Sequence, residues 1–359
     1  MLPHSPPLAP LSSRFVNHRQ GQAGCASYGT FPVVSPGLIF QEYGRSRSVS
    51  PAGYVSFYQP SSLRPAHFHG QLELLVVTRR QLSCLVGSRK YVARAPALIW
   101  HLPTVGHQTI EASPDCFFWV VLFEPFFAEL VLSPTNHAGL GAGLARFGVP
   151  PRLAKRARGP FGSWILALTN LVGARPMLEI SSRAADTINE LGVRAVDGET
   201  SEQLTHALRE ILLIAVDESE RRLSRLTSPS LSELGIALLL ATPELKRDAM
   251  CRELNVSASY LARQFQRQAG ATFAHFRSRA RVVSFLAAVT HNGASLLQAA
   301  LESGFGSYSQ AHRVFSSLTG YCPSCYLESG GRTRLSEVTI ESLVPRLGSP
   351  FRDTDGTSS

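Results

Sequence analysis

The stretch GFGSYSQAHRVFSSLTGYCPSCYL, residues Gly304–Leu327, indicates how the C-terminal third of the chain folds. Ser307 follows two glycines and can cap a helix through its hydroxyl group. In that helix Ala311 and Phe315 are four residues apart, so both point to the same, inward side. The stretch therefore predicts a tight turn, a serine cap and a helix with one packed face.

The same pattern occurs fifty residues earlier in the chain. Ser257–Phe276 aligns with Ser307–Tyr326, and segments that precede both, Arg247–Leu254 and Ser295–Ser303, also read as helices. The aligned pairs are Ser257 with Ser307, Arg263 with Arg313, Phe265 with Phe315, Gly270 with Gly320, and Phe276 with Tyr326. We interpret the match as two copies of one supersecondary unit.

Each copy has the form of a helix-turn-helix, in which the second helix enters the major groove of DNA. Arginine there can donate two hydrogen bonds to guanine, and glutamine can pair with adenine. An ordinary helical hairpin with a solvated face has the same pattern, and the repeat favours the helix-turn-helix. The residues expected to contact DNA are Ser257, Ser259, Ala262, Arg263, Gln266, Arg267, Arg279, Ser307, Ser309, Gln310, His312 and Arg313.

Residues 234–330 resemble the DNA-binding domain of the AraC/XylS family of bacterial transcription regulators. The resemblance is carried by Gly304, Phe305, Arg313, Phe315, Thr319, Gly320, Pro323 and Tyr326. It implies two helix-turn-helix units, about 246–270 and 295–320, which read two successive major-groove turns. The helix that joins them would be Phe273–Val289, with Arg277, Arg279 and Arg281. The implied partners are promoter DNA and RNA polymerase.

The N-terminal half has a different pattern, expected to form one domain over residues 46–124. Short runs rich in Val, Leu, Tyr, Phe and Trp alternate with Gly, Pro and Ser, which predicts an antiparallel β-sandwich or barrel. The expected strands are Tyr54–Tyr58, Leu72–Thr78, Leu82–Val86, Lys90–Ala93, Leu98–Leu102 and Phe117–Phe123.

Histidines and a glutamate gather in this region as HxHxxxE followed by a further histidine. The residues are His67, His69, Glu73 and His107. The pattern resembles the cupin barrel, whose metal sites use three His and one Glu, and also the sensor domain attached to many AraC/XylS regulators. Imidazole with carboxylate suits Zn, Fe, Mn, Ni or Cu. Motif glycines are missing, so we expect these four residues to line an effector pocket without a metal or other cofactor.

Residues 125–225 are expected to be helical. In Gln203–Arg222 the residues Leu204, Leu208, Ile211, Leu212 and Ala215 form one apolar face. This face fits either packing on the chain's own barrel or the seam of a homodimer. Residues 226–233 are expected to be a linker, and residues 1–45 and 331–359 mobile tails.

The composition narrows the class of protein. Lys and Arg number 35 against 26 Asp and Glu, which gives a formal charge of +9 and favours an anionic partner. Neither a secretory signal nor an apolar run of membrane-spanning length is present, so we expect a cytoplasmic protein. The six cysteines do not form a disulfide framework, and Cys322 and Cys325 lack the second pair that a zinc site needs.

The sequence thus predicts an α+β multidomain protein, with a cupin-like antiparallel β-barrel and helices followed by an all-α double helix-turn-helix. The predicted function is that of a DNA-binding transcription factor, not an enzyme, which responds to a small-molecule effector bound by the barrel. The alternative is a cupin-type metal-dependent enzyme or metal sensor fused to a DNA-binding module.

Overall fold

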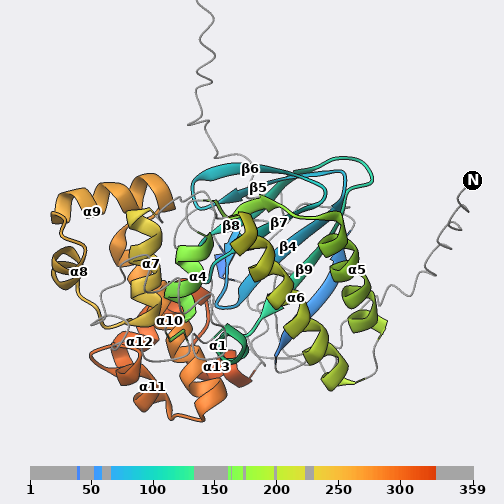
Figure 1. The fold of residues 1–359 in the computed structure, drawn as a ribbon. Coiled ribbons are helices and arrows are strands. Elements are labelled where there is room, and N and C mark those ends of the chain that lie inside the picture. The colour runs from blue at the N-terminus through green and yellow to red at the C-terminus, as the bar shows by residue number, and fades with distance from the viewer. Residues whose placement is uncertain are drawn as a thin grey trace, which may run out of the picture. The chain divides into compact units, whose positions relative to one another are not determined.

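A computed structural model describes residues 39–40, 52–58, 66–132, 161–162, 164–172, 175–197, 200–222 and 230–328 (Figure 1). The expected C-terminal tail, the first half of the linker and nearly all of the N-terminal tail lie outside these residues, and a helix begins at Leu231 within the second half of the expected linker. Within them, none of the helices combines the length and the apolar character that are needed to cross a bilayer.

The N-terminal half consists of two five-stranded sheets. The first has the order β1-β3-β8-β5-β6, and the second β10-β7-β4-β9-β2. The strands of the first are β1 (Ile39–Phe40), β3 (His67–Phe68), β8 (His107–Ala112), β5 (Gln81–Val86) and β6 (Arg89–Arg94). Those of the second are β10 (Met177–Glu179), β7 (Ala97–His101), β4 (Leu72–Arg79), β9 (Phe117–Phe123) and β2 (Gly53–Tyr58). All pairings are antiparallel except that of β1 with β3.

The two sheets share a buried core. Leu82 and Cys84 of β5 belong to one apolar cluster with Leu75 of β4 and Ile99 of β7. These side chains alternate along their strands, as expected where one face of each sheet is buried. The expected antiparallel β fold is confirmed, with one correction: the described strands form two separate sheets rather than a closed barrel.

Between β9 and the C-terminal region, the described residues form α1 (Pro125–Leu132), α4 (Trp164–Val172), α5 (Ser182–Asp197) and α6 (Ser201–Arg222), with β10 between α4 and α5. The predicted apolar face of α6 is buried within this single chain, where α6 packs against α5 and β2. Its residue Ser219 also accepts a hydrogen bond from Trp100 Nε1 of β7 at 3.1 Å. The apolar face of α6 is therefore part of the chain's own core, and it is not available as a dimer seam.

The C-terminal third is helical, as predicted. Its elements are α7 (Leu231–Ala241), α8 (Arg247–Glu253), α9 (Ala258–Gln264), the π-turn η1 (Phe265–Ala269), α10 (Phe273–Asn292), α11 (Leu296–Glu302), α12 (Tyr308–Thr319) and α13 (Pro323–Glu328). Ser257 caps α9 by accepting from the Tyr260 amide, and Ser307 caps α12 by accepting from the Gln310 amide.

The two copies of the repeat also share an aromatic contact. Phe265 lies edge-on to Phe276 with 5.7 Å between ring centroids, and Phe315 lies edge-on to Tyr326 at 5.3 Å. All four rings are buried. The positions that align in sequence thus perform the same packing role, and the two supersecondary units are confirmed. Beyond the second unit's turn, Cys322 and Cys325 form a disulfide.

Gly304 provides a test of the turn between α11 and α12 within the second unit. Its φ is +79°, and a Cβ there would lie 2.8 Å from the Cα of Glu244. Gly293 has a similar φ of +64° but no atom within 4 Å of the equivalent position. Gly293→Ala should therefore cost only the left-handed conformation, about 1 kcal/mol, and Gly304→Ala should cost about 1–3 kcal/mol more because backbone must move. Urea unfolding of both variants measures the difference, and equal losses would contradict the predicted clash.

Candidate functional site

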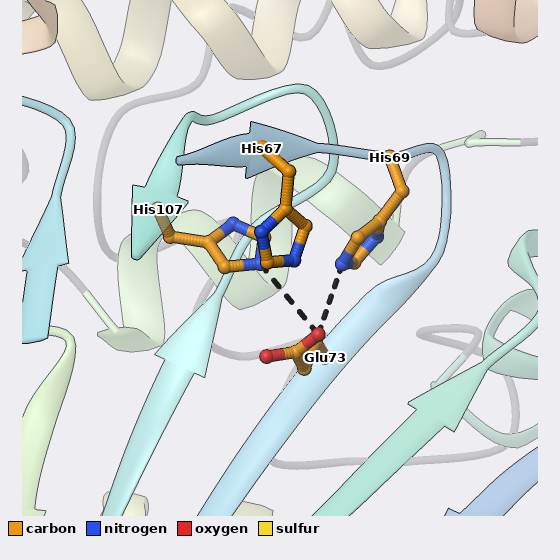
Figure 2. Close-up of side chains that lie close together, drawn as sticks. All are labelled: His67, His69, Glu73 and His107. Carbon is orange, nitrogen blue, oxygen red and sulfur yellow. Dashed lines mark hydrogen bonds and ion pairs between the residues drawn. The ribbon is translucent and has the colours of Figure 1, made fainter. Parts of the chain in front are cut away.

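The four candidate pocket residues lie together at one end of the two sheets, and Figure 2 shows their side chains pointing toward one another. Strand pairing places them there. His67 of β3 lies directly opposite His107 of β8 in the first sheet. Glu73 of β4 belongs to the second sheet, and His69 lies in the short connection between β3 and β4. One site thus draws residues from both sheets, and we call it the histidine site.

Glu73 is the centre of the histidine site. Its Oε2 lies 2.9 Å from His69 Nε2 and 3.6 Å from His107 Nε2. Its other oxygen, Oε1, is 2.7 Å from Nδ1 of His101. These four side chains are each no more than 4% exposed. A carboxylate is therefore held away from water by three imidazole rings.

Burial and charge act in opposite directions on these groups. Burial alone would raise the pKa of Glu73, but the neighbouring histidines, His107 first, hold it well below its usual value. Burial lowers the pKa of His69, and it lowers the pKa of His101 to about 4. The carboxyl group is thus ionised, and burial favours neutral rings at His69 and His101.

Backbone carbonyls fix two of the rings. Nδ1 of His69 is 3.1 Å from the carbonyl oxygen of Gln71, and Nδ1 of His107 is 3.0 Å from that of Val105. A carbonyl can only accept, so these Nδ1 atoms carry protons, and the Nε2 atoms face the carboxylate. Histidines that ligate metals are commonly oriented in this way, by a hydrogen bond from the other ring nitrogen.

His101 belongs to this cluster but was not a candidate from the sequence. It lies at the end of β7, directly opposite Glu73 in the antiparallel pairing of β4 with β7. Its ring also stacks on that of His107, with 4.1 Å between centroids. The expected strands Leu72–Thr78 and Leu98–Leu102 contain Glu73 and His101. Only the register of their pairing, which the sequence does not give, brings the two residues together.

Most of the residues predicted to contact DNA lie on the solvent side of the two units. The exposed ones are Ser257, Ser259, Ala262, Arg263, Gln266, Arg267, Ser307, Ser309 and Arg313, and His312 is half-buried. Gln310 is also half-buried, and its Oε1 accepts from the Gly306 amide at 2.8 Å. With Ser307 it forms a reciprocal cap at the start of α12.

Arg279 is the exception, and the prediction that it contacts DNA needs correction. It is 5% exposed. Its Nη1 donates to the carbonyl oxygen of Thr104 at 3.3 Å, and its guanidinium lies over Phe68 at 4.6 Å from the ring centroid and over Phe276 at 5.1 Å. Burial lowers the pKa of Arg279 to about 10. The side chain is directed into the sheets of the N-terminal half because α10 packs there.

Comparison with known families agrees with the helical repeat. The helix-turn-helix domain family matches residues 250–329, which include α9, α10, α11, α12 and α13 and most of α8. Residues 250–329 are an AraC-type DNA-binding domain. No curated protein matches the chain.

Several solved structures are distantly similar to parts of this chain. ToxT from Vibrio cholerae with a bound unsaturated fatty acid is 12% identical, with a TM-score of 0.39, over 80% of this chain and 97% of that one. The AraC-like transcriptional activator CuxR is 13% identical, with a TM-score of 0.27, over 66% and 72%. Oxalate decarboxylase from Bacillus subtilis is 13% identical, with a TM-score of 0.17, over 44% and 42%. These scores are low and carry no argument, so the comparisons identify only the helix-turn-helix domain of residues 250–329.

The burial of Arg279 predicts how its loss affects the AraC-type domain. Arg279→Ala should lower the free energy of unfolding by roughly 1–3 kcal/mol, because two ring contacts and a hydrogen bond disappear. It should leave the salt dependence of binding to a mixed-sequence DNA duplex unchanged. A phosphate contact would instead reduce the slope of log K against log salt by about 1. Titrations at several salt concentrations decide between these outcomes. The control is Arg194→Ala, which removes an exposed side chain of α5.

Proposed function

We propose that this chain is a sequence-specific DNA-binding transcription factor that regulates promoters in response to a small-molecule effector bound by the N-terminal half. The observation that carries the proposal is the pair of capped helix-turn-helix units within residues 230–328, whose second helices leave their polar faces exposed. This observation supports a regulator of transcription over the alternative of a cupin-type enzyme.

DNA recognition would divide between the two units. In the first, Ser259 and Ala262 are short, so Arg263 supplies most of the direct base contacts. In the second, Arg313 and His312 face outward from α12. Lysine and arginine contacts to phosphate supply affinity that falls with salt, and the contacts to base edges supply sequence preference.

Effector binding would act through the contact between the two halves of the chain. Besides Arg279, Ser88 after β5 donates to the carbonyl oxygen of Arg267 in η1 at 2.8 Å. An effector that binds one arrangement of the halves more tightly shifts the population toward that arrangement. We further propose that the protein acts in the cytoplasm as a homodimer that contacts RNA polymerase, through surfaces other than the buried stripe of α6.

Arg313 tests sequence-specific readout. Arg313→Ala should weaken binding by about 1–3 kcal/mol to those sequences whose guanine it contacts, and it should relax the preference at that position. The measurement is selection from a random duplex library, followed by titration of selected and mismatched duplexes. Arg194→Ala, which removes another exposed arginine, on α5, should change neither. An equal loss of affinity for all sequences would show that Arg313 contacts phosphate instead.

A further inference from the structure

The histidine site has the dimensions of an ion rather than of an organic molecule. One ligand atom from each of His67, His69, Glu73 and His107 lies within 4.8 Å of all the others, and all four residues are buried. Transition metals bind imidazole nitrogen and carboxylate oxygen at about 2.0–2.2 Å, so atoms on opposite sides of an ion are about 4 Å apart. The four atoms need to close only slightly to surround one ion.

Two ring nitrogens of the site face the Glu73 carboxylate with no proton between them, and a cation can occupy that position. His69 has an acceptor at both ring nitrogens, the Gln71 carbonyl at Nδ1 and the Glu73 carboxylate at Nε2. His107 has the same two kinds of neighbour, and its Nε2 has no hydrogen-bond partner among the described residues. A neutral ring has one proton, so in each case a lone pair of Nε2 faces a carboxylate oxygen.

These nitrogen atoms converge on Glu73 inside a buried site, where the rings of His69 and His107 have 4.9 Å between their centroids. A divalent cation placed among the Nε2 atoms and Oε2 satisfies the same lone pairs while the rings stay neutral. His101 then holds the other carboxylate oxygen in place, a role that outer partners commonly have at metal sites.

The segments that carry these ligands also contact the AraC-type domain. The Thr104 amide donates to the His69 carbonyl at 2.9 Å, and the Thr104 carbonyl accepts from Arg279 of α10. Next to His69, Gly70 lies so close to Val283 of α10 that a Cβ would be 2.6 Å from Cγ1. A movement of His69 or His107 toward an ion is therefore a movement of the surface on which α10 rests.

We propose that the histidine site binds one first-row transition-metal dication, such as Zn²⁺, through His67, His69, Glu73 and His107, and that this ion is the effector, acting on DNA binding through Thr104 and Arg279. The proposal rests on the function proposed above and names the ligand class of that effector site.

Metal binding is tested first, on the full chain stripped with a chelator and then titrated separately with Zn²⁺ and Co²⁺. We expect one ion per chain, measured by elemental analysis after gel filtration, and a visible Co²⁺ spectrum of nitrogen and oxygen ligation. Glu73→Gln and His107→Ala should each weaken binding at least tenfold, since loss of an outer partner of a ligand alone costs roughly 10–100-fold. His206→Ala, which changes an exposed residue of α6, should retain metal binding.

Failure to bind stoichiometric Zn²⁺ or Co²⁺ overturns the metal site. Binding that survives in both ligand variants also overturns it, because the ion would then lie elsewhere. Circular dichroism and thermal unfolding of the metal-free variants separate a lost ligand from a lost fold, since a folded variant that binds no ion supports the proposal.

DNA binding is tested second, with duplexes selected from a random library by metal-free and by Zn²⁺-loaded protein. We expect loading to change the affinity of the wild type about tenfold or more, within the usual range of coupling between two sites. Arg279→Ala should still bind Zn²⁺ but change its DNA affinity less than about twofold. An unchanged wild-type affinity overturns the effector role, and a full response in Arg279→Ala overturns the transmission. If no duplex is selected in either state, the function proposed above fails, whereas the ion titration still reports on the metal site.

Discussion

The burial of the Glu73 carboxylate is the constraint on which the N-terminal half depends. An ionised carboxylate in an apolar interior costs several kcal/mol or more unless partners compensate for the lost water. Here the partners come from both sheets and from their connection: His101 from β7, His107 from β8 and His69 after β3. The end of the fold that holds this site is therefore fixed by electrostatics as well as by the apolar core further along the strands.

A second buried charge lies next to the first and fixes the place of α10. The Arg279 guanidinium is held by the Thr104 carbonyl and by the faces of Phe68 and Phe276. Phe68 is adjacent to His67 and His69 in sequence, and Thr104 precedes His107 by three residues. The anionic site and the cationic contact thus share two short segments of backbone. The transmission proposed above therefore needs to pass through these two segments only.

The sequence predicted those features that repeat or alternate locally. The fifty-residue repeat gave both helix-turn-helix units with their serine caps, and the alternation of apolar residues gave six of the strands. The other four strands are not among the six, since β8 is half-polar and β1, β3 and β10 are only two or three residues long. His101 was missed for another reason: its role depends on the register of β4 with β7, which local periodicity does not determine. The stripe of α6 was ambiguous because periodicity shows that a face is buried but not what covers it.

The prediction for Arg279 is wrong because it relies on the residue type and not on the helix face that the residue occupies. Arginine on a helix of a DNA-binding domain commonly contacts phosphate. Yet Phe276, Arg279, Ala280 and Val283 recur at the spacing of one buried helix face, and all four are buried. Burying a guanidinium costs more than burying an apolar side chain of similar size, so the contact of α10 with the sheets is weaker than a leucine there would make it. A ligand can shift a contact of limited strength, because it changes an equilibrium only by the difference in its affinity for the two states. An arginine on this apolar helix face therefore suits the proposed role, in which binding of the ion changes the contact of α10 with the sheets.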